Sequence, residues 1–213
     1  HRELILPQLA GPGVAAHKVR KRSGFKVIYG PIRAHDLPAF LDAGLTATPE
    51  MRTKTFTLWE RTVLIPVELV SALKWSLILF PIFFLLGGLG GSGPYWERAL
   101  DDGIFAVVAL TGALVAGAVL TPLLLPWVPG RAFSLKGLIL GVITALFLTI
   151  FRMGHLATWP GRIEIISLFF LIPAVSAFLA MNFTGASTYT SLSGVRKEMR
   201  WAVPFEIGAS AIG

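Results

Sequence analysis

The first residues that could carry out chemistry form a glycine-rich stretch, residues 11–16 (GPGVAA). It matches the pattern G-x-G-x-x-G/A, which lets a backbone approach a pyrophosphate at a helix N-terminus. Pro12, however, removes one N–H donor from the stretch, and the acidic residue expected about 20 positions later is absent. Nucleotide binding and a simple tight turn both stay open, and the two departures favour the turn.

Candidate metal ligands are few. His17 lies in a basic run, residues 17–22, which is typical of a solvated or membrane-facing helix surface, and His35 and Asp36 lack a further ligand at useful spacing. The chain has no cysteine, which removes disulfides, thiolate nucleophiles and metal–sulfur sites from it. We therefore expect no catalytic and no metal-ligating residue in this sequence, and we interpret the histidines as surface residues.

The elements that position these residues alternate between strand and helix. Residues 3–6 and 25–29 predict strands, and residues 14–22 and 34–43 predict helices, with Gly24 and Gly44 at the helix ends. This order indicates part of a parallel sheet. Because two strands cannot bury both faces alone, we expect residues 1–48 to be the C-terminal part of an α/β domain that begins before His1.

The remainder of the chain has the composition of a membrane protein. Apolar residues make up 54% of the sequence, charged residues 15%, and the mean hydropathy is +0.69, whereas soluble domains carry about 25% charged residues. We expect a connector and interfacial segment at 49–72, with Pro66 and Glu68 inside it, and a transmembrane domain at 73–213. Its predicted helices cover residues 73–90, 104–125, 135–151, 163–181 and a truncated fifth from 201. The fold class is thus α/β plus an all-α membrane bundle.

Charge indicates an orientation. With the N-terminal segment in the cytosol, the inner loops hold more basic residues than the outer loops. The inner residues are Arg131, Lys136, Arg196, Lys197 and Arg200, and the outer ones are Arg98, Arg152 and Arg162. The net charge of +7 lies mostly beside apolar segments, so we expect contact with membrane lipid and no nucleic acid. A multi-pass protein of the cytoplasmic (inner) membrane with a cytosolic soluble domain follows.

Two features of the membrane half leave function open. No charged residue lies in the middle of the four complete predicted spans, and Glu206 lies inside the truncated fifth, so transport is possible but unsupported. Residues 182–195 form a hydroxyl-rich stretch that suits either a flexible linker or an ordered loop.

Three runs resemble a known family in matching order. They are residues 29–41 (YGPIRAHDLPAFL), 47–52 (ATPEMR) and 64–70 (LIPVELV). They are similar to the HgcA family, the corrinoid proteins of mercury methylation, as is the loop at 182–200, so the resemblance covers nearly the whole chain.

The resemblance implies a Rossmann-like corrinoid-binding domain joined to five membrane helices. The implied activity is transfer of a methyl group from a cobalt-bound corrinoid to mercury(II), with a ferredoxin-like partner, HgcB, supplying electrons. The family's cap-helix motif, N-V/I-W-C-A-A/G-G-K, provides a cysteine ligand to cobalt, and this sequence has neither the motif nor a cysteine. By order in the family the motif belongs before His1, so we expect the chain to be a fragment that is inactive alone.

Ligands of open α/β sheets bind beyond the carboxyl ends of the strands. For a corrinoid this predicts contacts after each of the two strands. The candidate cofactor-binding residues are Gln8, Gly11, Gly13, Val14, Tyr29, Gly30, Pro31 and Arg33. Arg33 could pair with a propionamide carbonyl or a phosphate of the cofactor.

Two other functions stay open at this point. One is a non-catalytic membrane anchor or transport protein that carries a small α/β domain. The other is a corrinoid methyl carrier of acetyl-CoA metabolism, although the apolar half disfavours it because such carriers are usually soluble.

Overall fold

Two parallel strands begin the chain in the computed structural model, which describes residues 2–89, 93–186 and 192–213. Strand β1 (Glu3–Pro7) pairs with β2 (Lys26–Gly30), with Ile5 opposite Ile28. Helix α1 (Ala16–Ser23) connects them, as a parallel pair requires. The predicted strand–helix–strand–helix order and the parallel sheet are confirmed within unit His1–Thr55.

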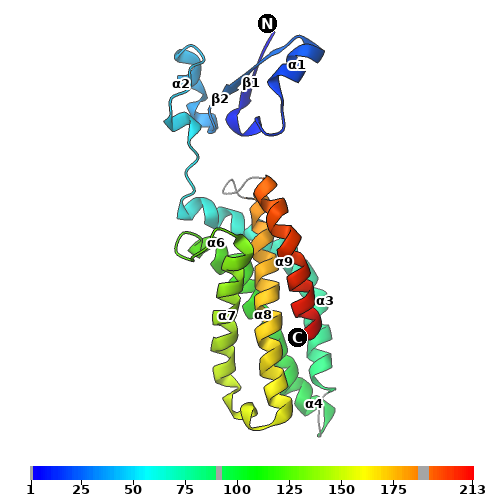
Figure 1. Ribbon diagram of the computed structural model, residues 1–213. Helices are drawn as coiled ribbons and strands as arrows, with labels where there is room; N and C mark the ends of the chain where they lie inside the picture. The colour runs from blue at the N-terminus through cyan, green and yellow to red at the C-terminus, as the bar shows by residue number, and fades with distance from the viewer. Residues whose placement is uncertain (1, 90–92, 187–191) are drawn as a thin grey trace. The chain divides into compact units, whose positions relative to one another are not determined.

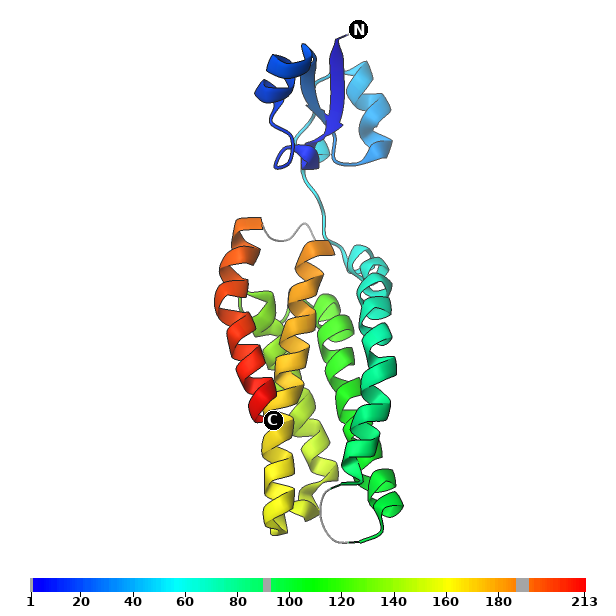
Figure 2. The same ribbon diagram turned by 90° about the vertical axis from the view of Figure 1, so that its right-hand side faces the viewer.

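Glycine and proline residues mark where the helices of this unit end and begin. Gly24 ends α1 in the left-handed conformation, with φ of 74°. The predicted helix at 34–43 is divided into a short 3₁₀ turn, η2 (Ala34–Asp36), and α2 (Leu37–Asp42). Pro38 lies in the first turn of α2, where its missing N–H costs no hydrogen bond. Helices α1 and α2 lie on opposite sides of the sheet (Figures 1 and 2).

One aromatic side chain forms the centre of this unit. Phe40 of α2 is fully buried and packs beneath Gly30, where an added Cβ would lie 3.4 Å from the Phe40 ring. Leu4, Ile5 and Phe25 stay exposed. The described residues therefore cover this small sheet only in part.

The second unit, Phe56–Gly213, is helical throughout its regular structure. Long helices make up most of it, together with 3₁₀ and π-helical turns. Its elements are α3 (Leu58–Gly87), α4 (Tyr95–Arg98), η4 (Ala99–Gly103), α5 (Ile104–Leu114), η5 (Val115–Leu120), α6 (Thr121–Leu124), α7 (Phe133–Phe151), η6 (Met153–Ala157), α8 (Trp159–Ala186) and α9 (Leu192–Ile212). The two remaining short turns, η1 (Gln8–Ala10) and η3 (Glu50–Arg52), belong to the first unit.

Four helical segments of the described chain are long and apolar enough to cross a membrane. They are Leu58–Gly87, Tyr95–Leu124, Phe133–Phe151 and Trp159–Phe183. The protein is therefore mostly helical, with a small parallel sheet at its N-terminus and the character of a multi-pass membrane protein. Helix α9 is not among the four, because charged residues occupy its first half and Glu206 lies further along.

Several predicted boundaries need correction. Helix α3 begins at Leu58, so most of the predicted connector at 49–72 is helix and continuous with the first span. Thr57 and Glu60 form a capping box that starts α3 early, and Pro66 lies inside the helix. The fifth helix begins at Leu192, ahead of the predicted 201, and α8 continues to Ala186. Residues 182–186 and 192–195 of the predicted hydroxyl-rich loop are helical, and its centre lies outside the described residues.

Close contact between small residues holds α7 against α8, which run side by side (Figures 1 and 2). A Cβ added to Gly137 would lie 2.6 Å from both the Ala180 Cβ and the Ser176 carbonyl oxygen. The Ser176 hydroxyl donates a 2.8 Å hydrogen bond to the Gly137 carbonyl. Small residues and interhelical hydrogen bonds of this kind let helices associate where lipid removes the hydrophobic driving force.

Candidate functional site

The carboxyl ends of β1 and β2 form one edge of the sheet. Pro7 and Gly30 are paired in the last register position, so the segments that follow each strand leave from the same edge. In open α/β sheets this edge is where ligands bind. All eight predicted cofactor contacts lie within or directly after these strands.

A cavity of about 340 Å³ lies at this edge. Three of the eight predicted residues, Gly30, Pro31 and Arg33, line it. The other lining residues are Ile5, Leu6, Pro7, Ile32, Ala34, Leu37 and Leu41. The structure thus brings together the end of β1, the segment after β2 and one face of α2.

Close packing around Gly30 leaves little room for a side chain at this position. An added Cβ would lie 3.1 Å from the Ile5 Cγ2 as well as close to Phe40, so a side chain here would press on both the neighbouring strand and α2. Pro31 is also buried. The backbone after β2 is fixed further by a 2.9 Å hydrogen bond from the Ile32 N–H to the Met51 carbonyl.

Arg33 contributes the only basic side chain among the residues that line this described cavity. It is half-buried, and one terminal guanidinium nitrogen donates to the Thr55 hydroxyl. A guanidinium has five N–H donors in a planar fork, so one such bond leaves most of its hydrogen-bonding capacity. Arg33 is therefore positioned, by its contact with Thr55, at an otherwise apolar cavity.

The other five predicted residues form a separate cluster around the loop after β1. The Tyr29 hydroxyl donates to the Val14 carbonyl, and a Cβ on Gly11 would lie 3.3 Å from the Gln8 carbonyl oxygen. Gln8, Gly11, Gly13, Val14 and Tyr29 do not line the cavity. Their assignment to a cofactor stays a prediction.

Backbone hydrogen bonds in this loop bear on the nucleotide alternative. The Gly11 N–H donates to the Gln8 carbonyl, and the Gly13 and Val14 N–H groups both donate to the Ala10 carbonyl, at 3.2, 3.0 and 2.9 Å respectively. A pyrophosphate loop needs such N–H groups to point at the phosphate. The loop satisfies them internally, which favours a tight turn over a nucleotide site.

Candidate metal ligands occur elsewhere than the sequence indicated. His35 pairs with its neighbour Asp36 at 3.1 Å, and the described residues place no further carboxylate or histidine ligand beside it. In the membrane unit, acceptor atoms of Asp102, His155 and Glu164 all lie within 4.8 Å of one another. These residues are far apart in the chain, so no spacing pattern could reveal them.

Arg152 lies beside the cluster of Asp102, His155 and Glu164 and argues against a metal site there. It is almost fully buried, and its guanidinium lies 3.2 Å from Asp101, 3.1 Å from Asp102 and 3.5 Å from Glu164. It also lies 4.3 Å from the centre of the Phe105 ring. The acidic groups therefore already face a cation of the chain itself, which favours an ion-pair network over a metal site.

Two other basic residues are buried rather than turned to lipid headgroups. Arg61 donates to the carbonyls of Pro122 and Leu123, and Lys136 donates to the carbonyl of Leu125. These carbonyls belong to the end of α6, where helical acceptors lack partners. Lys136, which the sequence placed on the inner side, therefore binds a carbonyl at a helix end.

No protein-family profile, no curated protein and no solved structure matches this chain.

Proposed function

We propose that this chain belongs to a corrinoid-dependent methyltransferase that methylates mercury(II), in which unit His1–Thr55 contributes one wall of the cofactor pocket. One observation carries the proposal. The run at 29–41, which carries the resemblance to the HgcA family, supplies most of the residues that line the cavity at the carboxyl edge of the sheet. The residues that resemble the HgcA family therefore lie at the edge of the sheet where ligands of open α/β sheets bind.

The residues present fit part of the cofactor's surroundings. A corrinoid macrocycle is larger than a cavity of about 340 Å³, so the cavity would hold only one edge of it. Gly30 and Pro31 allow close backbone approach, and Arg33 offers donors to an amide carbonyl or a phosphate. A thiolate ligand to cobalt does not fit these residues, because the sequence contains no cysteine, and the proposal requires it from outside this sequence.

In the proposed reaction the cofactor, the partner protein and the residues of this chain have separate roles. When bound, the corrinoid would supply a methyl group that moves to mercury(II) with the electron pair of its cobalt–carbon bond, and the ferredoxin-like HgcB would return electrons for the next cycle. The Arg33 guanidinium would hold the cofactor's polar periphery, and the apolar lining would limit access of water. The membrane helices would keep the unit at the cytosolic face of the inner membrane.

The test uses the full-length protein that contains this sequence, in membranes together with its ferredoxin-like partner. We expect methylmercury to form from mercury(II), and cobalt to copurify in about equimolar amount. Arg33→Gln is expected to lower cobalt occupancy by about tenfold, equivalent to one lost charge-assisted hydrogen bond. Arg52→Gln, an exposed arginine that does not line the cavity, is the matched control and should leave occupancy unchanged.

Three outcomes would contradict the proposal. Cobalt-free protein would favour the alternative of a non-catalytic membrane anchor or transport protein with a small α/β domain. Bound corrinoid without methylmercury, but with methyl transfer into acetyl-CoA synthesis, would indicate a methyl carrier instead. Equal cobalt loss in both arginine variants would show that Arg33 does not act at the proposed wall.

A further inference from the structure

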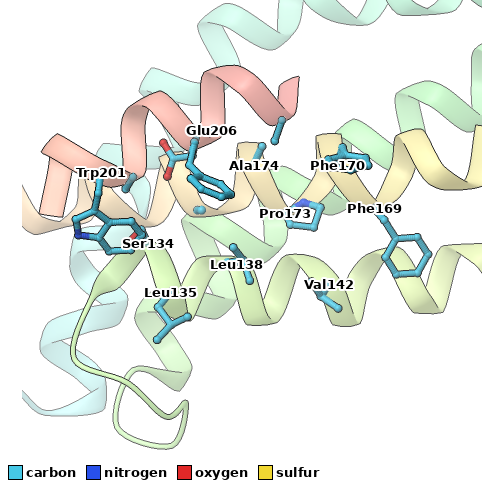
Figure 3. Close-up of a pocket in the computed structure, with 14 residues that line it drawn as sticks. Ser134, Leu135, Leu138, Val142, Phe169, Phe170, Pro173, Ala174, Trp201 and Glu206 are labelled. Atoms are coloured by element: carbon cyan, nitrogen blue, oxygen red, sulfur yellow. The ribbon is translucent and has the colours of Figure 1, made fainter. Parts of the chain in front are cut away.

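A second cavity, of about 360 Å³, lies between α7, α8 and α9 in the membrane unit (Figure 3). Most of its lining is apolar, including Leu138, Phe169 and Pro173. Ser134, Trp201 and Glu206 add polar atoms. In Figure 3 these three lie toward one end, and Val142 and Phe169 lie toward the other, so the cavity itself is amphipathic.

The polar atoms of this cavity lack partners among the described residues. Both carboxylate oxygens of Glu206 and the hydroxyl oxygen of Ser134 are buried without a hydrogen bond. Glu206 is only 9% exposed. A buried carboxylate without a donor is costly, so such groups are normally paired or bound to a ligand.

The chain provides no cation for this carboxylate within the described residues. Glu198, two helical turns earlier on α9, accepts a 2.6 Å hydrogen bond from the Ser134 backbone N–H and adds negative charge. Lys136 of α7 donates to the Leu125 carbonyl instead. The cavity therefore combines an apolar body with an acidic end that is short of donors.

We propose that this cavity binds an amphiphile with a primary ammonium head group. The ammonium lies at the acidic end, where the two Glu206 carboxylate oxygens and the Ser134 hydroxyl oxygen lack partners among the described residues and can accept its N–H donors. Trp201 lines the same end, and an indole ring beside a cation adds electrostatic attraction. The apolar body of the ligand lies along Leu138 and Pro173. This site belongs to the membrane unit and is independent of the methyl-transfer proposal.

Two sources could supply this chemistry: a membrane lipid with an ethanolamine head group or a free alkylamine. The experiment uses the full chain in phosphatidylcholine nanodiscs, with decylammonium, decanol and decyltrimethylammonium as probes of equal chain length. Binding is followed by native mass spectrometry. Discs with phosphatidylethanolamine replacing part of the phosphatidylcholine distinguish the lipid source, because an occupying lipid would compete with decylammonium.

We expect decylammonium to bind at least tenfold more tightly than either decanol or the trimethyl compound, which has no N–H donor. Glu206→Gln should abolish that preference, and it should fold because it removes a buried charge at constant shape. Glu68→Gln, a matched change on α3 outside the cavity, should keep the preference. Competition by phosphatidylethanolamine would assign a lipid, and its absence would assign a free amine.

Equal binding of decylammonium and decanol would overturn the proposal, because the cavity would then select apolar volume alone. Unchanged decylammonium binding to the Glu206→Gln variant would overturn it as well, and so would the absence of binding by any probe.

Discussion

Exposed apolar side chains occur in both units, but they have different physical meanings. In the membrane unit, Leu77 is 76% exposed and Ile150 is 62% exposed on helices of span length. Lipid tails cover such side chains at no cost. In the first unit, Leu4 of β1 and Phe25, which precedes β2, are each 41% exposed where water would reach them. The comparison shows that exposure has to be judged against the solvent of each unit.

The two units also differ in how they are held together. Phe40 dominates the core of the first unit, whereas small residues let the membrane helices approach closely. Ion pairs around the buried Arg152, and carbonyls capped by buried basic side chains, occur among the described residues of the membrane unit. We therefore expect the stability of the first unit to depend on the buried volume of its core side chain. The stability of the second unit should depend on close contact between its helices and on its ion pairs.

The largest expected effect tests the dependence of the first unit on Phe40. Phe40→Ala should lower the free energy of unfolding of this unit by about 3 kcal/mol or more, because it removes a fully buried ring. Hydrogen exchange of the β2 amides measures the loss. Phe25→Ala, at a half-exposed position, is the control and should change it much less. If Phe40→Ala also abolished the thermal transition of the membrane unit, the two units would unfold together, and their separate stabilisation would be contradicted.

The next effect tests paired charge in the membrane unit. Arg152→Gln should destabilise this unit by about 2 kcal/mol, below the value for a fully buried pair because its carboxylate partners are partly exposed. Thermal unfolding in detergent measures the change. Arg152→Lys should recover only part of it, since an ammonium cannot fork between several carboxylates.

Arg162→Gln provides the control for this change, because Arg162 donates to a backbone carbonyl and stacks on Trp159 without an acidic partner in the described residues. We expect an effect within about 0.5 kcal/mol. If Arg152→Gln and Arg162→Gln lowered the stability equally, the ion-pair network would contribute no more to stability than an exposed arginine does.

Close fit between helices is tested by two glycine-to-alanine changes. Gly137→Ala should destabilise the membrane unit by about 1–2 kcal/mol, because the new methyl group would overlap α8. Gly208→Ala on α9 meets nothing within 4 Å and should be neutral or slightly stabilising through its helix propensity. The detergent unfolding assay compares the two. Equal effects would mean that the α7–α8 contact adjusts freely.

The smallest effect concerns an exposed charge of the first unit. A backbone N–H and the Thr48 hydroxyl donate to Glu50 and hold the pKa of its carboxyl below the ordinary value of 4.5. Because the ionised form is favoured in the folded state, this small contribution to stability is present above pH 4.5 and lost as pH falls through the lower pKa.

An NMR titration of the Glu50 carboxyl should show this lowered midpoint. Thr48→Ala should raise the pKa toward 4.5, whereas Thr53→Ala should not, because the Thr53 hydroxyl donates to the Pro49 carbonyl. An unchanged midpoint in the Thr48 variant would remove the hydroxyl from this account.

Local patterns were sufficient for much of the fold. Alternating apolar and turn residues predicted β1, α1 and β2 because each depends on neighbours in sequence. They failed at α3, where the capping box at Thr57 outweighs the proline that suggested a break. The strand edge was predicted too, but only the tertiary structure separated Gly30, Pro31 and Arg33, which line the cavity, from the five residues around Tyr29.

The sequence by itself determined that this is a chain of long apolar helices preceded by a small parallel sheet, because span length and strand–helix alternation are properties of contiguous residues. The tertiary structure alone decided which charges meet. Arg152 faces Asp102 and Glu164, Lys136 caps a distant helix end, and Glu206 is left with no described partner beside an apolar cavity. The contacts of Arg152 and Lys136 join residues on different elements, and pairing across a fold, like the lack of it at Glu206, depends on packing that no single segment encodes.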